Sequence, residues 1–399
     1  MVKQHKQSYW LPLSILLLTQ LLTALPLKLG SLLSIVWFTW IAICSYFVFL
    51  FLSGKKSLRN NLFAKLILLF WLMNAISYLI SPKTINSIET LVLFKSTTIA
   101  LLSYFPFYYY SSKGIINQNN LQRFTLFLFL TTVLINVFGR FNLAELYSKD
   151  DVVLNQSYLF VNLLPLIFIL FRRGPLYLLV TITVLLVLWG AKRGAILCMV
   201  VELMVFIFYL FKYDSFGKKH RGKILILFMM MIGVGAYYIE RNDFLQERLT
   251  KTGTEDDRSG EIRTEMYKSL FEAYLLSSTS NEIVFGRGIG QTVSITGSLA
   301  HQDWLELLID NGFVGLVLYI FMIILCINKS FKRETPLVLR YGLRGCIIIW
   351  ILTATYSMVF ASRESFVFFI SVGVIDGLIQ RCRINQRMEA YNEVKLLEI

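Results

Sequence analysis

Long apolar runs recur along most of this chain of 399 residues. The hydrocarbon core of a bilayer is about 30 Å thick, and a helix needs about 20 apolar residues to cross it. Twelve runs qualify, some of them short, at residues 10–27, 31–52, 62–80, 88–110, 123–138, 156–171, 175–190, 194–211, 223–240, 306–327, 343–360 and 365–380. The sequence therefore predicts an all-α polytopic membrane protein with about twelve transmembrane helices.

The composition supports the membrane class and argues against nucleic-acid binding. The chain is 56% hydrophobic and 16% charged, so its charges are gathered between the apolar runs. Its net charge of +14 comes from cations that flank these runs, where they set orientation and meet anionic lipid. The first run ends without a small-residue cleavage site, so we expect a retained span rather than a cleaved signal peptide.

The distribution of Lys and Arg predicts the orientation. Twelve spans place both termini on one side, and cytoplasmic segments carry the excess of these residues. The richest segments on the side of the termini contain Lys55, Lys56, Arg59, Arg172, Arg173, Lys212, Lys218, Lys219, Arg221, Lys223, Lys329, Lys332, Arg333, Arg340, Arg344, Arg381, Arg383 and Arg387. Both termini are therefore expected in the cytoplasm.

One connection is much longer than the others. Residues 241–303 lie between the ninth and tenth spans, on the predicted extracytoplasmic side, and loops of this length are usually functional or disordered. We expect four segments: spans one to nine in 1–240, the large loop in 241–303, spans ten to twelve in 304–380, and a cytoplasmic tail in 381–399.

The loop contains an amphipathic stretch, RSGEIRTEMYKSLFEAYLL. Its apolar residues recur at helical spacing, and Ser259 is a suitable N-cap with Glu261 in the first turn. The apolar face comprises Ile262, Met266, Leu270 and Tyr274, with Tyr267, Phe271 and Leu275 beside them. Such a helix is expected to lie on the membrane or on the helix bundle.

Neither cysteine nor histidine is arranged for a metal site. Cys44, Cys198, Cys326, Cys346 and Cys382 are scattered, and no pair is poised for a disulfide. His5 and His220 lie in Lys/Arg-rich segments, and only His301 lies elsewhere. We expect no histidine-based metal centre and no cofactor.

His301 is the candidate general base. It directly precedes a short apolar helix in SLAHQDWLELLIDNGFVGLVLYI, whose first turn contains Asp303 and which Asp310, Asn311 and Gly312 interrupt. An imidazole that titrates near neutrality is the usual general base, and this one is predicted at the outer membrane surface. The alternative is a histidine that caps or anchors a re-entrant helix.

Arg193 and Lys192 follow the seventh span in LWGAKRGAIL. Two cations on the translocated side of a very short turn oppose the positive-inside trend. An anionic substrate would explain them, because a guanidinium can hold phosphate oxygens in a bidentate manner. The alternative is snorkelling to lipid phosphates.

Three further arginines are expected on the outer face. Arg258 and Arg263 open the amphipathic helix, where ordinary ion pairs with nearby acids are the alternative explanation. Arg363 lies in a minimal turn beside Glu364, and a local ion pair explains it equally well. The glycines of VFGRGIGQT do not form a nucleotide-binding fingerprint, so we interpret them as a turn.

These cations and one histidine converge on the outer face of a bundle that can accommodate a lipid tail. A polyprenyl-diphosphate sugar has matching parts: an apolar tail, a diphosphate for the arginines and an anomeric carbon for attack.

Four motifs resemble those of the bacterial O-antigen polymerase and O-antigen ligase superfamily. They are AKRGA, similar to S-R-G-A; SGEIRTEMYKS, similar to G-x-R-x-x-x-[WY]; FGRGIG, similar to G-x-G; and HQDWLELLIDNGFVGLVLY, similar to H-N-x-x-L-x-x-L-x-x-x-G-x-x-G-x-x-x-Y. The last motif is the most specific. With the twelve spans and the loop in the expected interval, the resemblance covers essentially the whole chain.

The resemblance implies a GT-C-type fold in the bacterial inner membrane and a metal-independent, inverting transfer from an undecaprenyl-diphosphate-linked glycan. It implies diphosphate contacts for Arg193 and Arg263, with Arg258 beside them, and acceptor activation by His301. Lys192, Arg363 and Asp303 are accessory candidates. Two positions depart from the family pattern: Ala191-Lys192 replaces the common Thr/Ser-Ser before the arginine, and Gln302 replaces the usual Asn or Ser. These departures leave the acceptor undefined.

Polymerase and ligase differ in their acceptor, which is another lipid-linked repeat unit for the polymerase and lipid A-core or a protein for the ligase. The form of the histidine motif favours a repeat-unit polymerase of O-antigen lipopolysaccharide or capsule pathways, and a chain-length regulator is a partner that family membership would suggest. A flippase would need charged residues within the spans and repeated halves, which the pattern does not favour.

Overall fold

The computed structural model describes residues 15, 30–54, 60–81, 87–146, 153–250, 258–277, 279–360, 362 and 364–397. Within these ranges the secondary structure is helical and contains no strand. Nine helices in these ranges are long and apolar enough to cross a membrane, and two shorter apolar helices accompany them. The chain is an all-α polytopic membrane protein, as predicted; the first expected run lies almost wholly outside the described residues.

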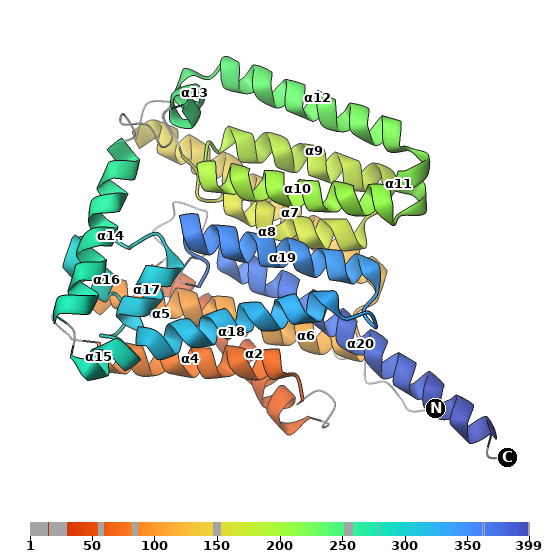
Figure 1. The fold of residues 1–399 in the computed structure, drawn as a ribbon, viewed down its shortest axis with the longest axis horizontal. Helices are drawn as coiled ribbons and strands as arrows, with labels where there is room; N and C mark the ends of the chain where they lie inside the picture. The colour runs from red at the N-terminus through yellow and green to blue at the C-terminus, as the bar shows by residue number, and fades with distance from the viewer. Residues whose placement is uncertain are drawn as a thin grey trace.

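The long helices run side by side as one bundle, and their bounds follow most of the apolar runs (Figure 1). They are α2 (Gly30–Ser53), α4 (Leu62–Ile80), α5 (Ser87–Leu102) with α6 (Tyr104–Lys113), α7 (Gln118–Leu146), α8 (Ser157–Leu170), α9 (Arg173–Trp189), α10 (Arg193–Lys212), α12 (Arg221–Glu240), α18 (Gly312–Phe331), α19 (Leu337–Tyr356) and α20 (Ser365–Leu397).

Short helices cover the two ends of the bundle unequally. One end carries α13 (Asp243–Thr250), α14 (Arg258–Ser277), α15 (Ser280–Phe285), α16 (Gln291–Thr296) and α17 (Asp303–Asp310), at the left of Figure 1. We call this the loop-helix end. The opposite end has α11 (Ser215–Lys219) and the protruding last turns of α20.

Several helix boundaries differ from the expected ones: α7 is longer at both ends, α5 and α6 divide one run, and α20 continues into the expected tail. The run at 306–327 is divided, since α17 ends at Asp310 and α18 begins at Gly312. Gly312 has a φ of 66°, and a Cβ there would lie 2.4 Å from the backbone nitrogen of Gly286. The break therefore lets another chain segment pack against the junction. The run at 343–360 is shifted, because its helix spans Leu337–Tyr356.

Helix α8 lies at the centre of the bundle. All of its residues are buried, and it contacts α7, α9, α10, α19 and α20. By contrast, only Ile224 and Gly235 of α12 are buried, so the apolar surface of that helix faces outward. Burial inside the bundle thus positions the N-terminal end of α8 beneath the loop helices.

A buried ion pair ties four helices together toward the opposite end. The Lys329 ammonium lies 2.7 Å from the Asp376 carboxylate, which also accepts hydrogen bonds from Asn61 and from the Tyr104 hydroxyl. Charges within a membrane span are costly unless they are paired, so this network fixes the packing of α18 and α20 against α4 and α6.

Candidate functional site

The turn between α9 and α10 carries the first two candidate cations. Ala191 adopts a left-handed backbone conformation with a φ of 48°, and Lys192 and Arg193 follow it, both half-buried. Arg193 is the first residue of α10, where unpaired backbone N–H groups and the helix dipole favour an anion. The turn therefore presents two side-chain cations and a helix N-terminus in the same place.

This turn packs directly on the start of α8. A Cβ on Gly190 would lie 1.9 Å from the Ser157 Oγ, and one on Gly194 would lie 2.2 Å from the Tyr158 hydroxyl. Both hydroxyls are buried and have no hydrogen-bond partner among the described residues. Two glycines thus make room for two buried hydroxyls directly beside the cationic turn.

His301 lies at the loop-helix end, immediately before α17. Its backbone is left-handed, with a φ of 52°, and its side chain remains accessible. Neighbouring atoms remove part of its hydration and lower its pKa, and the positive charges of Lys192 and Arg263 lower that pKa further. The imidazole is therefore held neutral at neutral pH, which is the form that accepts a proton.

Arg263 lies in the second turn of α14, at the loop-helix end. Its charge acts on His301 and also on the Tyr158 hydroxyl. The structure thus brings Lys192, Arg263 and His301 together, although they are separated widely in sequence, with Tyr158 below them.

The structure gives less information on the other three predicted arginines, Arg193, Arg258 and Arg363. Arg193 joins the group through its neighbour Lys192, in the same turn. Arg258 begins α14, and its side chain lies outside the described part of the structure. Arg363 lies outside the described residues altogether. The diphosphate-binding roles of Arg193, Arg258 and Arg263 stay predictions, as does the accessory role of Arg363.

Asp303 is buried beneath the site. Its carboxylate accepts hydrogen bonds from the Tyr319 hydroxyl and, at 3.0 Å, from the Val359 backbone N–H. Burial raises the pKa of Asp303 to about 8, despite these hydrogen bonds. It joins α17 to α18 and to the segment after α19, so it fixes the first turn of α17, two residues after His301.

Two further acids on the same face of α17 fix the surrounding loop. Glu306 accepts from the Ala300 N–H at 2.8 Å and from the Thr292 hydroxyl at 2.5 Å. Asp310 accepts from the N–H groups of Gly290 and Gln291 at 2.8 and 3.0 Å, at the start of α16. Because Glu306 holds the residue before His301, it helps to maintain the left-handed histidine backbone.

The glycine-rich segment is a packing turn, as interpreted from the sequence. Gly286, Gly288 and Gly290 all have positive φ angles. A Cβ on Gly286 would lie 2.3 Å from the Asp310 carbonyl oxygen. The Arg287 N–H donates to the Ile309 carbonyl at 2.9 Å. Only glycine allows this close approach of the turn to the junction of α17 and α18.

Helix α14 packs on the loop helices through part of its apolar face. Leu270 and Tyr274 are buried with Ala300 and Ile309, and Met266 packs against them. Ile262, Phe271 and Leu275 of the expected face are instead exposed. The helix therefore lies on the bundle and leaves a second apolar strip uncovered.

Residues 177–320 match the O-antigen ligase family model. This segment of the chain is similar to O-antigen ligases. The matched segment starts within α9 and ends within α18, and it contains every candidate site residue except Arg363. The resemblance to the O-antigen polymerase and ligase superfamily is thereby confirmed. A comparison with curated proteins gives no match.

The sequence analysis missed several parts of the candidate site and its surroundings. The acids of α17 are spaced i, i+3 and i+7, which places them on one helical face, and this spacing could have signalled their shared role. Tyr158 lies outside the matched segment, and nothing near it in sequence indicates Arg263.

Within the described residues, no group of three His, Cys, Asp or Glu side chains could hold a metal ion.

Proposed function

We propose that the chain is a glycosyltransferase that polymerises lipid-linked oligosaccharide repeat units. One observation supports this most: His301 is accessible, lies near Lys192 and Arg263 at one end of an apolar bundle, and has a lowered pKa that favours its neutral form. The donor that suits this arrangement is an undecaprenyl-diphosphate-linked glycan. The family model supports a role in O-antigen pathways.

In the proposed reaction, the donor diphosphate lies against Arg193 and Arg263, with Lys192 and Arg258 nearby. His301 accepts the proton of the acceptor hydroxyl as its oxygen attacks the anomeric carbon. The new glycosidic bond forms as the bond between that carbon and the diphosphate oxygen breaks, with inversion. The cations stabilise the charge that develops on the departing undecaprenyl diphosphate.

We further propose a GT-C-type arrangement in the bacterial inner membrane, with both termini cytoplasmic. The loop-helix end then faces the extracytoplasmic side, where lipid-linked glycans await transfer. The predicted chain-length regulator belongs to this proposal as a partner. Metal independence also belongs to it: transfer by purified protein should survive EDTA, and a loss that Mg²⁺ restores would contradict it.

The second candidate is an O-antigen ligase, which transfers the glycan to lipid A-core or to a protein. The description of the matching family favours it. A polysaccharide transporter is less well supported, because the candidate residues gather at one end of the bundle rather than along a path through it.

The size distribution of surface glycan in a deletion strain distinguishes these functions. The strain is complemented with the wild-type protein, with His301→Ala or with His220→Ala, which alters a histidine at the opposite end. Loss of the long-chain ladder, with single repeat units still attached, supports polymerase. Full-length chains that remain on the lipid carrier indicate ligase. Normal glycan with His301→Ala would contradict the proposed site.

A further inference from the structure

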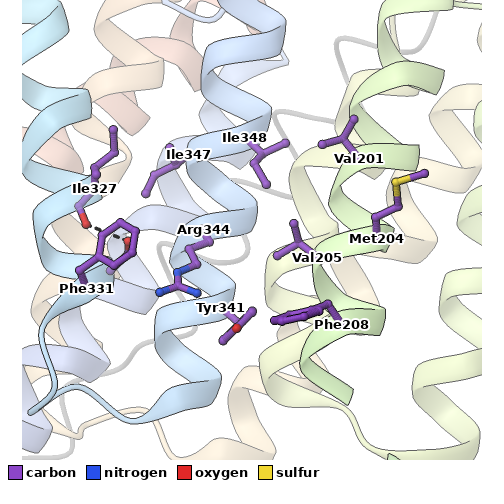
Figure 2. Close-up of a pocket in the computed structure, with 11 residues that line it drawn as sticks. Val201, Met204, Val205, Phe208, Ile327, Phe331, Tyr341, Arg344, Ile347 and Ile348 are labelled. Atoms are coloured by element: carbon purple, nitrogen blue, oxygen red, sulfur yellow. Dashed lines mark hydrogen bonds between the residues drawn. The ribbon is translucent and has the colours of Figure 1, made fainter. Parts of the chain in front are cut away.

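A groove far from the candidate site opens between α10, α18 and α19. Its volume is about 460 Å³. Aliphatic side chains line one part of it: Val201 and Val205 from α10, Ile327 from α18, and Ile347 and Ile348 from α19 (Figure 2). This volume lies in the range of ligand sites in proteins, and the lining suits a hydrocarbon chain.

The other part of the groove is aromatic and cationic. Figure 2 shows Arg344 between Phe331 and Tyr341, with Phe208 across the groove. The guanidinium carbon lies 4.7 Å from the ring centroid of Phe331 and 4.6 Å from that of Tyr341. The two rings hold the guanidinium by cation–π contacts in an apolar setting.

Among the described residues, no carboxylate forms an ion pair with Arg344. The ion pairs Lys268–Glu272 and Lys329–Asp376 involve other cations. Its buried Nε has no hydrogen-bond partner among the described residues. A guanidinium at membrane depth without an acidic partner favours an anionic ligand, and phosphate oxygens suit its planar donors.

The groove opens on the outer surface of the bundle. Met204, Phe208 and Phe331 on its borders are 57%, 50% and 64% exposed. Arg344 follows the first residue of α19 by seven positions, which is about 10 Å along the helix from the end opposite the loop helices. This places the cation below the membrane surface and the aliphatic part deeper still, in the order of a phospholipid's phosphate and acyl chain.

We infer that this groove binds an anionic phospholipid of the leaflet opposite the loop helices. Arg344 contacts the phosphate, and one acyl chain lies along the aliphatic residues between α10 and α18. In the orientation proposed above, this is the cytoplasmic leaflet. The site is separate from the proposed glycosyl transfer, so either proposal can fail alone.

Native mass spectrometry of the purified full-length protein tests this inference. The protein is supplied with equal phosphatidylglycerol and phosphatidylcholine in detergent. Wild type should retain phosphatidylglycerol preferentially. Arg344→Gln should weaken that retention about tenfold, as expected for losing a hydrogen bond to a charged group. Val205→Phe, which fills the groove and keeps the arginine, should weaken it too.

The matched control is Arg333→Gln. Arg333 is an exposed arginine between α18 and α19, and it does not line the groove. It should retain phosphatidylglycerol as wild type does. Excess inorganic phosphate should not displace the lipid, because the acyl chain contributes to binding. Equal retention by wild type and Arg344→Gln, equal binding of phosphatidylcholine, or displacement by phosphate alone would each overturn the inference.

Discussion

The buried hydroxyl of Tyr158 lies 2.2 Å from the point that a Cβ on Gly194 would occupy. This contact joins α8 to the first turn of α10, directly beside Lys192 and Arg193. The position of the cationic turn therefore depends on the small size of Gly194, the glycine of the AKRGA motif.

Gly194→Ala should reduce glycosyl transfer by about tenfold or more, because misplacement of a binding group by about 1 Å can cost about a hundredfold. The added methyl group must displace either the tyrosine hydroxyl or the start of α10. The measurement is the transfer rate of the purified variant. Gly233→Ala serves as control, since a Cβ there meets nothing within 4 Å. Equal rates for Gly194→Ala and wild type would contradict this prediction.

The pH dependence of transfer should show a depressed histidine pKa. Because Lys192 and Arg263 lower the pKa of His301, the active neutral form persists below the usual histidine range. Activity should therefore be level at neutral pH and fall only in mild acid. Lys192→Gln should raise that pKa and move the acidic limb of the profile to higher pH. If Lys192→Gln leaves the acidic limb of the profile at the same pH, Lys192 does not lower the pKa of His301, and the prediction is wrong.

Thermal stability should decrease as the pH rises through the range set by the buried acids of α17. Burial raises the pKa of Asp303 to about 8 and that of Glu306 to about 7, so the folded protein binds protons that the unfolded chain releases near pH 4. Their contribution is complete below about pH 4 and is lost progressively up to about pH 8.

A melting series of the purified protein from pH 5 to pH 9 measures this effect. Asp303→Asn should flatten the decrease, since the amide does not titrate. Glu282→Gln is the control, because the half-buried Glu282 accepts a hydrogen bond from the Thr279 backbone N–H and has a lowered pKa, so its own titration falls below this range. A wild-type protein whose stability rises from pH 5 to pH 9 would contradict the assignment.

The Lys329–Asp376 pair should behave as a buried ion pair. Lys329→Met leaves the carboxylate without its cation and should cost about 3–5 kcal/mol of stability. The double variant Lys329→Met/Asp376→Leu should recover much of this loss, because neither charge remains buried. Unfolding in detergent measures both. If the double variant is as unstable as the single one, the ion pair is not the main contribution of these residues.

The apolar runs predicted most of the spanning helices, because membrane thickness and backbone hydrogen bonding leave few alternatives. They did not predict the break at Gly312. That break depends on the backbone of Gly286, which approaches from another part of the loop. Hydropathy measures residues one by one and carries no information about such a contact.

The candidate site was predicted in part. Lys192 was predicted from its position against the positive-inside trend, His301 from its place at the outer surface and Arg263 from the family resemblance, and the structure brings them together. Tyr158 and Glu306 were not predicted as parts of the site, because their roles depend on the fold. Tyr158 is an ordinary residue of an apolar run until Gly194 packs over it, and Glu306 is an ordinary acid until it binds the Ala300 N–H.

The most direct test of the central claim is transfer by purified protein in lipid vesicles supplied with an undecaprenyl-diphosphate-linked repeat unit. Wild type should release undecaprenyl diphosphate and build a ladder of products, and His301→Ala should form none, while its donor binding remains. Arg263→Ala should weaken donor binding. A wild-type ladder that His301→Ala reproduces at the same rate would contradict the account.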